Sequence, residues 1–207
     1  MTGTRIAIAA PRDNRNAPNA GSAYLYEPAN LADAPGVLNH PGLSFGNGFG
    51  RRVAISGSRL VASGHYGTLG GSILVHDLAS ATPGIPVVVI ENPTPDYSDW
   101  FEVVAISGSK LVVGAYADSN DGAASGCAYV FDLDGANPGT PLVTLHNPAP
   151  DPGDSFGGTV AIEGNRVLVS ATGEDEGVAP PRAEPAARAD VDGGDRGDVG
   201  GEQRGHR

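Results

Sequence analysis

Oxygen-bearing side chains that could bind a metal ion gather in the loop at residues 118–122, which reads Asp-Ser-Asn-Asp-Gly. Carboxylate and amide oxygens are the ligands that Ca²⁺ prefers in proteins. Asp118, Asn120 and Asp121 are therefore candidate calcium ligands, and calcium is the one cofactor that the sequence suggests. The glycine comes one position earlier than a regular calcium loop requires, so a solvated acidic turn is the competing interpretation.

Residue types for catalysis are present but do not form a recognisable set. A serine nucleophile needs a Gly-x-Ser-x-Gly turn and a partner histidine. Ser56 and Ser107 come nearest, yet both lie in turns that recur along the chain. Paired carboxylates can hydrolyse glycosides, but the aspartates that follow each Asn-Pro, such as Asp151 and Asp154, fit a polar rim better. We therefore expect that the protein is not an enzyme.

Charge and cysteine content exclude several kinds of partner. The formal net charge is −11, whereas nucleic acid requires clustered Lys and Arg. Lys110 is the only lysine, so a polybasic membrane-binding patch is absent. No apolar run has the length of a membrane span, and the N-terminus lacks a signal peptide. We expect no nucleic-acid partner and no membrane insertion. Cys127, the single cysteine, cannot form an intrachain disulfide.

An imperfect repeat with a spacing of 51 to 56 residues organises the chain. Val-Ala-Ile-Ser-Gly at residues 53–57 recurs at 104–108 and, with Glu in place of Ser, at 160–164. A basic residue and an apolar stretch follow each copy, at residues 59–63, 110–114 and 166–170. Residues 5–10 fit the same second position. Such internal periodicity indicates a repeat architecture.

Two further elements complete the repeat. The third lies at residues 21–27, 71–77 and 126–132, and the fourth at 86–93 and 141–148. Each repeat thus predicts four short strands separated by turn residues, with Gly57 in a hairpin between the first two. The third element alternates polar and apolar residues, which predicts a strand near the edge of its sheet. His76 falls where the sister repeats have Tyr26 and Phe131, so we interpret it as a packing residue.

One four-stranded sheet of this size cannot bury both of its faces. Radial stacking of such sheets supplies the missing cover, and that arrangement is a β-propeller. The sequence therefore predicts an all-β fold of propeller blades, each a four-stranded antiparallel repeat of about 51–56 residues. A flat solenoid of β-hairpins is the alternative that the pattern leaves open.

These residues resemble the FG-GAP repeat, the unit of the integrin α-chain propeller and of many bacterial secreted propellers. Phe49-Gly50 and Phe156-Gly157 carry the resemblance, together with the Val-Ala-Ile-Ser-Gly and Gly-x-Ala-Tyr-Val-Phe-Asp strands, and the bacterial form is the most similar. The third repeat departs from it, because Glu102 replaces the glycine after Phe101. The resemblance covers roughly residues 3–177. It implies about seven blades in a complete ring and Ca²⁺ in Asp-rich loops.

The chain divides into two parts on this interpretation. Residues 1–177 form the propeller repeats, with partial first and last blades, so we expect an incomplete propeller from a larger protein. Residues 178–207 contain no Leu, Ile, Phe, Tyr or Trp, and this composition predicts a disordered tail. Because composition changes in the middle of a repeat, we also hypothesise that the reading frame is lost near Gly177.

The expected function is non-enzymatic binding or adhesion. Loops on a rigid propeller would contact a protein or a glycan, and the family resemblance places the protein outside the cell or at the cell surface. Two alternatives stay open: an accessory propeller region of a secreted hydrolase whose catalytic domain lies elsewhere, and a truncated product with no function of its own. Open blade edges would also allow self-association.

Overall fold

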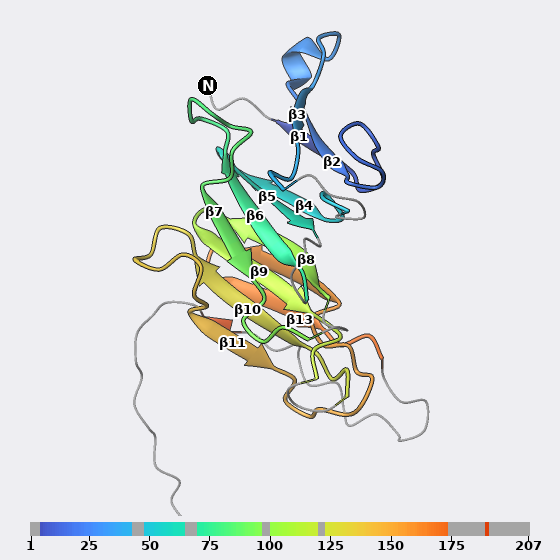
Figure 1. Cartoon of the computed structure of the whole chain (residues 1–207). Helices are drawn as coiled ribbons and strands as arrows, with labels where there is room; N and C mark the ends of the chain where they lie inside the picture. Colours follow the sequence, from blue (N-terminus) through green and yellow to red (C-terminus); the bar gives the residue numbers. More distant parts are fainter. Residues whose placement is uncertain are drawn as a thin grey trace, which may run out of the picture.

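The computed structural model describes residues 5–42, 48–64, 70–96, 100–119 and 123–173, and the backbone of residues 189–190. Its strands form four separate antiparallel sheets; in Figure 1 the first three follow one below another from blue to yellow, and the orange fourth sheet is drawn behind the third. The sheets do not close into a ring. This architecture confirms the predicted all-β fold and the incomplete propeller.

The two middle sheets are complete blades whose strands pair in chain order. The second sheet contains β4 (Val53–Ser56), β5 (Arg59–Gly64), β6 (Ser72–Asp77) and β7 (Val88–Glu91). The third contains β8 (Phe101–Ser107), β9 (Lys110–Ala115), β10 (Cys127–Asp132) and β11 (Val143–His146). The predicted order of four short strands in each repeat is therefore confirmed.

The two outer sheets each have three strands. The first contains β1 (Ile6–Ala10), β2 (Ser22–Tyr26) and β3 (Gly36–Leu38), and a short 3₁₀ helix, η1 (Pro28–Asn30), lies between β2 and β3. The repeat pattern did not identify β3, which is a third copy of the fourth strand. The fourth sheet contains β12 (Thr159–Glu163), β13 (Arg166–Ser170) and β14 (Ala189–Asp190).

Only β14 of the predicted disordered tail is described. It pairs with β13 so that Asp190 lies opposite Arg166, the position that Asp132 occupies opposite Lys110 in the third sheet. The other residues of 178–207 lie outside the described part of the chain, so disorder of the tail stays a prediction.

Alternation of side chains along the second strand of each sheet gives every blade two buried faces. In β5, Leu60 and Ala62 pack against the first sheet, whereas Val61 packs against the third. The period of two in a β-strand directs neighbouring side chains to opposite faces in this way. Three apolar clusters therefore fill the three gaps between four sheets.

The third strand of each middle sheet lies next to an edge strand, near the edge as the sequence predicts, but it is buried rather than half-exposed. The first five residues of β6 and of β10 are all buried. The two edges of each middle sheet are its first and fourth strands, and Val89 of the fourth strand β7 is 48% exposed. Alternation of polar and apolar residues in the third strand was misleading because small polar side chains, such as Ser72, are buried there.

The phenylalanine of the Phe-Gly pair is a wedge between neighbouring sheets. Phe49, Phe101 and Phe156 are all buried, and each belongs to a different one of the three apolar clusters. Their backbone N–H groups donate to carbonyls that precede the third strand of the previous sheet, with N–O distances of 2.9, 3.1 and 2.9 Å. One residue in each repeat thus both seals the gap and fixes the position of the next sheet.

Close backbone contact at this wedge requires glycine. Gly126, which precedes β10, has φ +79°, and a Cβ atom there would lie 2.2 Å from the carbonyl oxygen of Phe156. Gly21 stands in the same relation to Phe49, with φ +78° and 2.2 Å. Both the left-handed conformation and the short approach exclude a larger residue at these two positions.

The recurring serines tie the hairpin ends of neighbouring sheets together. The Oγ atom of Ser56 accepts a hydrogen bond from the backbone N–H of Gly108 at 3.0 Å. Ser107 accepts the same bond from Gly164 at 3.1 Å. Arg59 forms an ion pair with Asp134 across the gap between the second and third sheets. These contacts explain why serine recurs in the motif without a nucleophilic role.

In the part of the chain that the structure describes, no helix is long and apolar enough to cross a membrane.

Substitution of three glycines by alanine should separate the cost of the left-handed backbone conformation from the cost of the close backbone approach at the wedge. Gly126→Ala should lower the free energy of unfolding by about 3 kcal/mol or more, because it adds a backbone clash to an unfavourable φ. Gly108→Ala, which has φ +59° and no atom within 4 Å, should cost about 1 kcal/mol. Gly139→Ala, which also has open space, is the control. Urea denaturation would measure all three, and equal costs for Gly126→Ala and Gly108→Ala would contradict the wedge.

Candidate functional site

The two ends of the blades differ in the loops that they carry. Tight hairpins join first and second strands at one end, for example at Gly57 and Gly108. The connections from second to third strand (residues 11–21, and 116–119 with 123–126) lie at the other end, together with the segments that lead into the next sheet. In Figure 1 these loops project to the right of the sheets. We call this side of the molecule the loop end.

The predicted calcium residue Asp118 is at the loop end but is buried and hydrogen-bonded. It is 2% exposed, and its Oδ2 atom accepts hydrogen bonds from Thr94 Oγ1 at 2.8 Å and from the Tyr129 hydroxyl at 3.2 Å. The other two predicted ligands, Asn120 and Asp121, lie outside the described residues. Among the described residues, no group of three His, Cys, Asp or Glu side chains could hold a metal ion. Calcium binding stays a prediction.

The same carboxylate–tyrosine pair occurs in the first sheet. Asp13 follows β1 at the position that Asp118 has after β9, and its carboxylate accepts a hydrogen bond from the Tyr24 hydroxyl. In both sheets the backbone carbonyl of the aspartate accepts a further bond, at 3.0 Å, from the glycine that precedes the third strand. The aspartate thus attaches the loop to the third strand. The second repeat has Leu74 at the tyrosine position.

Hydrogen bonding and burial shift the pKa values of these pairs. The hydrogen bond from Tyr24 lowers the pKa of Asp13, and a backbone N–H from Arg15 lowers it further. Burial raises the pKa of Tyr129 well above that of an exposed tyrosine. Tyr129 therefore stays protonated and is a hydrogen-bond donor at neutral pH, which fits attachment of the loop rather than acid–base chemistry.

The remaining candidates for catalysis also have structural roles. Asp154 accepts hydrogen bonds from the Asn147 side chain at 2.6 Å and from the Asp151 backbone at 2.7 Å, so it stabilises the turn after β11. Cys127 is 1% exposed, like Ser22 at the equivalent position of β2. A small buried side chain is what both positions share.

His76 is a packing residue, as its place in the repeat predicts. It is 0% exposed, its Nδ1 atom lies 3.0 Å from the Pro83 carbonyl oxygen, and its ring meets Phe49 edge to face at 6.2 Å. Phe101 and Phe131 form the equivalent contact in the third sheet at 6.3 Å. Burial lowers the pKa of His76, and its Nε2 atom has no hydrogen-bond partner among the described residues.

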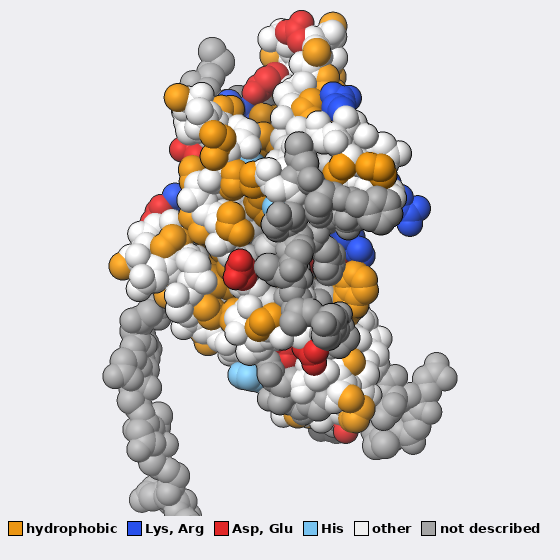
Figure 2. All heavy atoms as spheres, in the orientation of Figure 1, with side chains coloured by type: hydrophobic (Ala, Val, Ile, Leu, Met, Phe, Trp, Pro, Cys, Tyr) orange, Lys and Arg blue, Asp and Glu red, His pale blue; other side chains and the backbone are white. Residues whose placement is uncertain are grey.

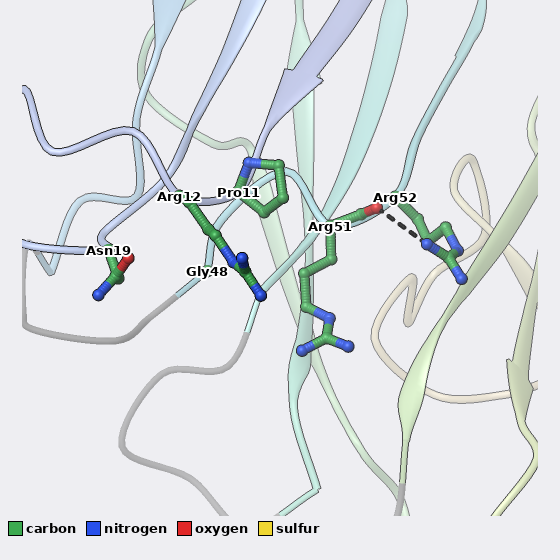
Figure 3. Close-up of a pocket in the computed structure, with 6 residues that line it drawn as sticks. All are labelled: Pro11, Arg12, Asn19, Gly48, Arg51 and Arg52. Carbon is green, nitrogen blue, oxygen red and sulfur yellow. Dashed lines mark hydrogen bonds between the residues drawn. The ribbon is translucent and has the colours of Figure 1, made fainter.

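The sequence did not predict a hollow that the structure has at the loop end. A cavity of about 570 Å³ opens between the first two sheets, shown in Figure 3. Its lining residues are Pro11, Arg12, Asn19, Gly48, Arg51 and Arg52. We call this hollow the arginine pocket. Its one signal in the sequence is the Arg-Arg pair directly after Phe49-Gly50, which becomes informative only once residues 11–19 are known to lie beside it.

Arg51 is held in place by the third sheet. Its Nε atom lies 2.6 Å from Oε2 of Glu102, which is 2% exposed, and its guanidinium lies 4.7 Å from the centre of the Trp100 ring. Trp100 in turn stacks on Tyr116 with an angle of 3° between the rings. Glu102 is the residue that replaces the glycine of the Phe-Gly pair, so this departure from the repeat positions an arginine.

Comparison with known proteins agrees with the repeat pattern. Residues 97–131 match the family model of the FG-GAP repeat. The resemblance to the FG-GAP repeat is thus confirmed for the third blade, and the wedge geometry is shared by the other blades. Residues 97–131 are therefore similar to an FG-GAP repeat.

A solved structure supports the propeller fold. A chain in the crystal structure of a mitotic checkpoint complex is similar, with a TM-score of 0.52 and 13% sequence identity. The similarity covers 81% of this chain and 40% of that chain. At this identity the likeness shows the fold alone. No curated protein matches the sequence.

Replacement of His76 should change how stability depends on pH. Because the folded-state pKa lies below the ordinary 6.5, the unfolded chain binds a proton more readily, and stability falls as pH drops below about 6.5. His76→Phe, the residue of the sister blade, should flatten this fall by up to about 1.4 kcal/mol per pH unit. Urea denaturation from pH 8 to pH 5 would measure the slope, and a slope equal to wild type would contradict the buried neutral histidine.

Proposed function

We propose that this chain is a non-enzymatic propeller module that binds a protein or glycan ligand through its loop end. The observation that carries the proposal is the arginine pocket, which lies among long loops on a scaffold of packed sheets. Binding residues are commonly found on loops that a rigid scaffold positions. A hollow of this volume is also within the range of small-ligand sites.

The polar residues with catalytic potential support a binding role, because the fold already uses them. Ser56 and Ser107 bond the next sheet, Asp118 bonds Thr94 and Tyr129, and His76 packs on Phe49. A nucleophile or a general base needs access to substrate, and these groups are engaged between sheets or under loops. We propose that the module acts outside the cell or at the cell surface, since FG-GAP repeats are typical of extracellular proteins.

A charge reversal at each end of the blades tests this proposal. Glycan and extracellular-matrix protein arrays should reveal a ligand that binds wild type and loses about tenfold or more in affinity with Arg52→Glu, because a repulsive charge then faces the ligand. Arg166→Glu, which makes the same change at the hairpin end, is the matched control and should leave binding intact. Binding that is lost with Arg166→Glu and kept with Arg52→Glu would contradict a loop-end site.

The outer faces of the first and last sheets favour a second property, self-association. Ile6 and Ile8 of β1 are 41% and 50% exposed, and Leu168 of β13 is 54% exposed. The equivalent residues of the middle sheets, Leu60 and Val112, are buried against a neighbour. The exposed face of the first sheet is the face that a middle sheet packs against the preceding sheet, and the exposed face of the last sheet is the face that a middle sheet packs against the following sheet. We propose that they pair head to tail between copies, a contact that forms a ring or a chain of copies.

Sedimentation velocity over a range of concentrations tests head-to-tail pairing. Leu168→Asp and Ile8→Asp should each raise the dissociation constant about tenfold or more, because each puts a charge in an apolar contact. Val89→Asp, on the exposed edge of an inner sheet, is the matched control. A monomer at every concentration, or equal weakening by Val89→Asp, would contradict this mode of association.

A further inference from the structure

We propose that the arginine pocket recognises one anionic group, a carboxylate or a sulfate, on an acidic oligosaccharide. This inference rests on the proposed function and names the ligand class of the same site. The chain has a net charge of −11, yet three of its arginines line a single hollow. Figure 2 shows Lys and Arg side chains along the right-hand edge of the upper half of this face, over the first two sheets.

Two arginine side chains converge in the pocket. In Figure 3, Arg12 and Arg51 extend to the same side of the ribbon, whereas Arg52 turns beyond the Arg51 backbone, whose carbonyl oxygen it reaches at 3.3 Å. Guanidinium groups that share a hollow repel one another, and an anion between them removes that cost. Arg12 forms no ion pair with a carboxylate in the described part of the chain.

Arg51 provides a fixed recognition group. Glu102 binds its Nε atom and Trp100 lies against its guanidinium plane, so the side chain is ordered before a ligand arrives. Ordering in advance reduces the entropy lost on binding. With Nε occupied by Glu102, the Nη groups are left for a ligand, and a planar guanidinium suits the two oxygens of a carboxylate or sulfate.

The lining favours a sugar over a peptide. Among the described lining residues Pro11 is the one apolar side chain, and the others are three arginines, Asn19 and Gly48. Peptide ligands usually insert an aromatic or aliphatic anchor into an apolar pocket, whereas the described part of this lining is mainly polar. Guanidinium and amide groups instead match the hydroxyl and carboxylate groups of an acidic sugar.

The size of the pocket limits the ligand to a short acidic segment. A volume of about 570 Å³ accommodates one or two sugar rings. Glu102 neutralises part of the charge of Arg51, so the hollow can balance one or two negative charges. A nucleic acid needs a longer row of cations to follow its phosphates. Recognition of a single anionic sugar within a glycan fits the pocket, and recognition of a polyanionic backbone does not.

Isothermal titration of the full chain with digalacturonate tests the inference. Wild type should bind this disaccharide, and Arg12→Ala should weaken the affinity about tenfold or more, the typical loss of a charge-assisted contact. Arg12→Lys should recover part of the loss, because the charge remains without the planar donor pair. Arg166→Ala removes the same charge elsewhere and should have no effect. Galactobiose, which lacks the carboxylates, should not bind.

Other outcomes would overturn the inference in distinguishable ways. Equal binding of galactobiose, or an unchanged affinity in Arg12→Ala, would show that the anionic group is not recognised here. Tighter binding of a Glu-Glu dipeptide than of digalacturonate would assign the pocket to a protein ligand, and binding of inorganic sulfate alone would show simple anion attraction. The proposed function would survive each of these results, provided that arrays still yield a ligand sensitive to Arg52→Glu. The proposed function itself would be contradicted if the arrays yielded no ligand that binds at the loop end.

Discussion

The structure depends on one contact, the insertion of a phenylalanine from each repeat into the gap before its own sheet. Phe49, Phe101 and Phe156 are buried in three different clusters, and their backbone N–H groups bond the preceding sheet. Removal of a buried phenylalanine side chain typically costs about 3–5 kcal/mol, which is large beside the net stability of a domain. Because the described sheets pack against their neighbours in chain order, loss of one wedge would weaken the contact between the two parts of the stack on either side of it.

The wedge also explains how a binding feature could arise from a structural position. A glycine follows the phenylalanine where the chain must pass close to the previous sheet: a Cβ atom at Gly157 would lie 2.4 Å from the Cys127 carbonyl oxygen. In the third blade Glu102 takes this place, and β8 accommodates it with a bulge between Phe101 and Val103. The buried carboxylate then needs a cation, and Arg51 supplies it. The replacement of glycine by Glu102 in one repeat thereby fixes Arg51 in the lining of the arginine pocket.

Much of the fold could be predicted from the sequence, because repetition shows the strand pattern several times over. Hairpins at Gly57 and Gly108, and the burial of His76, follow from aligned positions alone. The repeat pattern did not identify β3, the first sheet's copy of the fourth repeat element, because Gly36-Val37-Leu38 is short and lacks the valine run of β7. The arginine pocket could not be predicted, since it joins residues on both sides of a gap whose closure depends on three-dimensional packing.

The aspartates of the second-to-third loops show why residue type alone misleads about chemistry. An acid at residue 118 suggests a calcium ligand when the loop is considered by itself. Its counterpart Asp13 occurs with Tyr24, and Asp118 with Tyr129, whereas the second repeat has Leu74 in the tyrosine position. A carboxylate that occurs with its hydroxyl partner is explained by a hydrogen bond inside the blade. Arg12, beside Asp13 in the same loop, has no such partner within the described blades and lies in the pocket. Charged loop residues that form no ion pair within the described blades, such as Arg12, are therefore the groups that can bind a ligand.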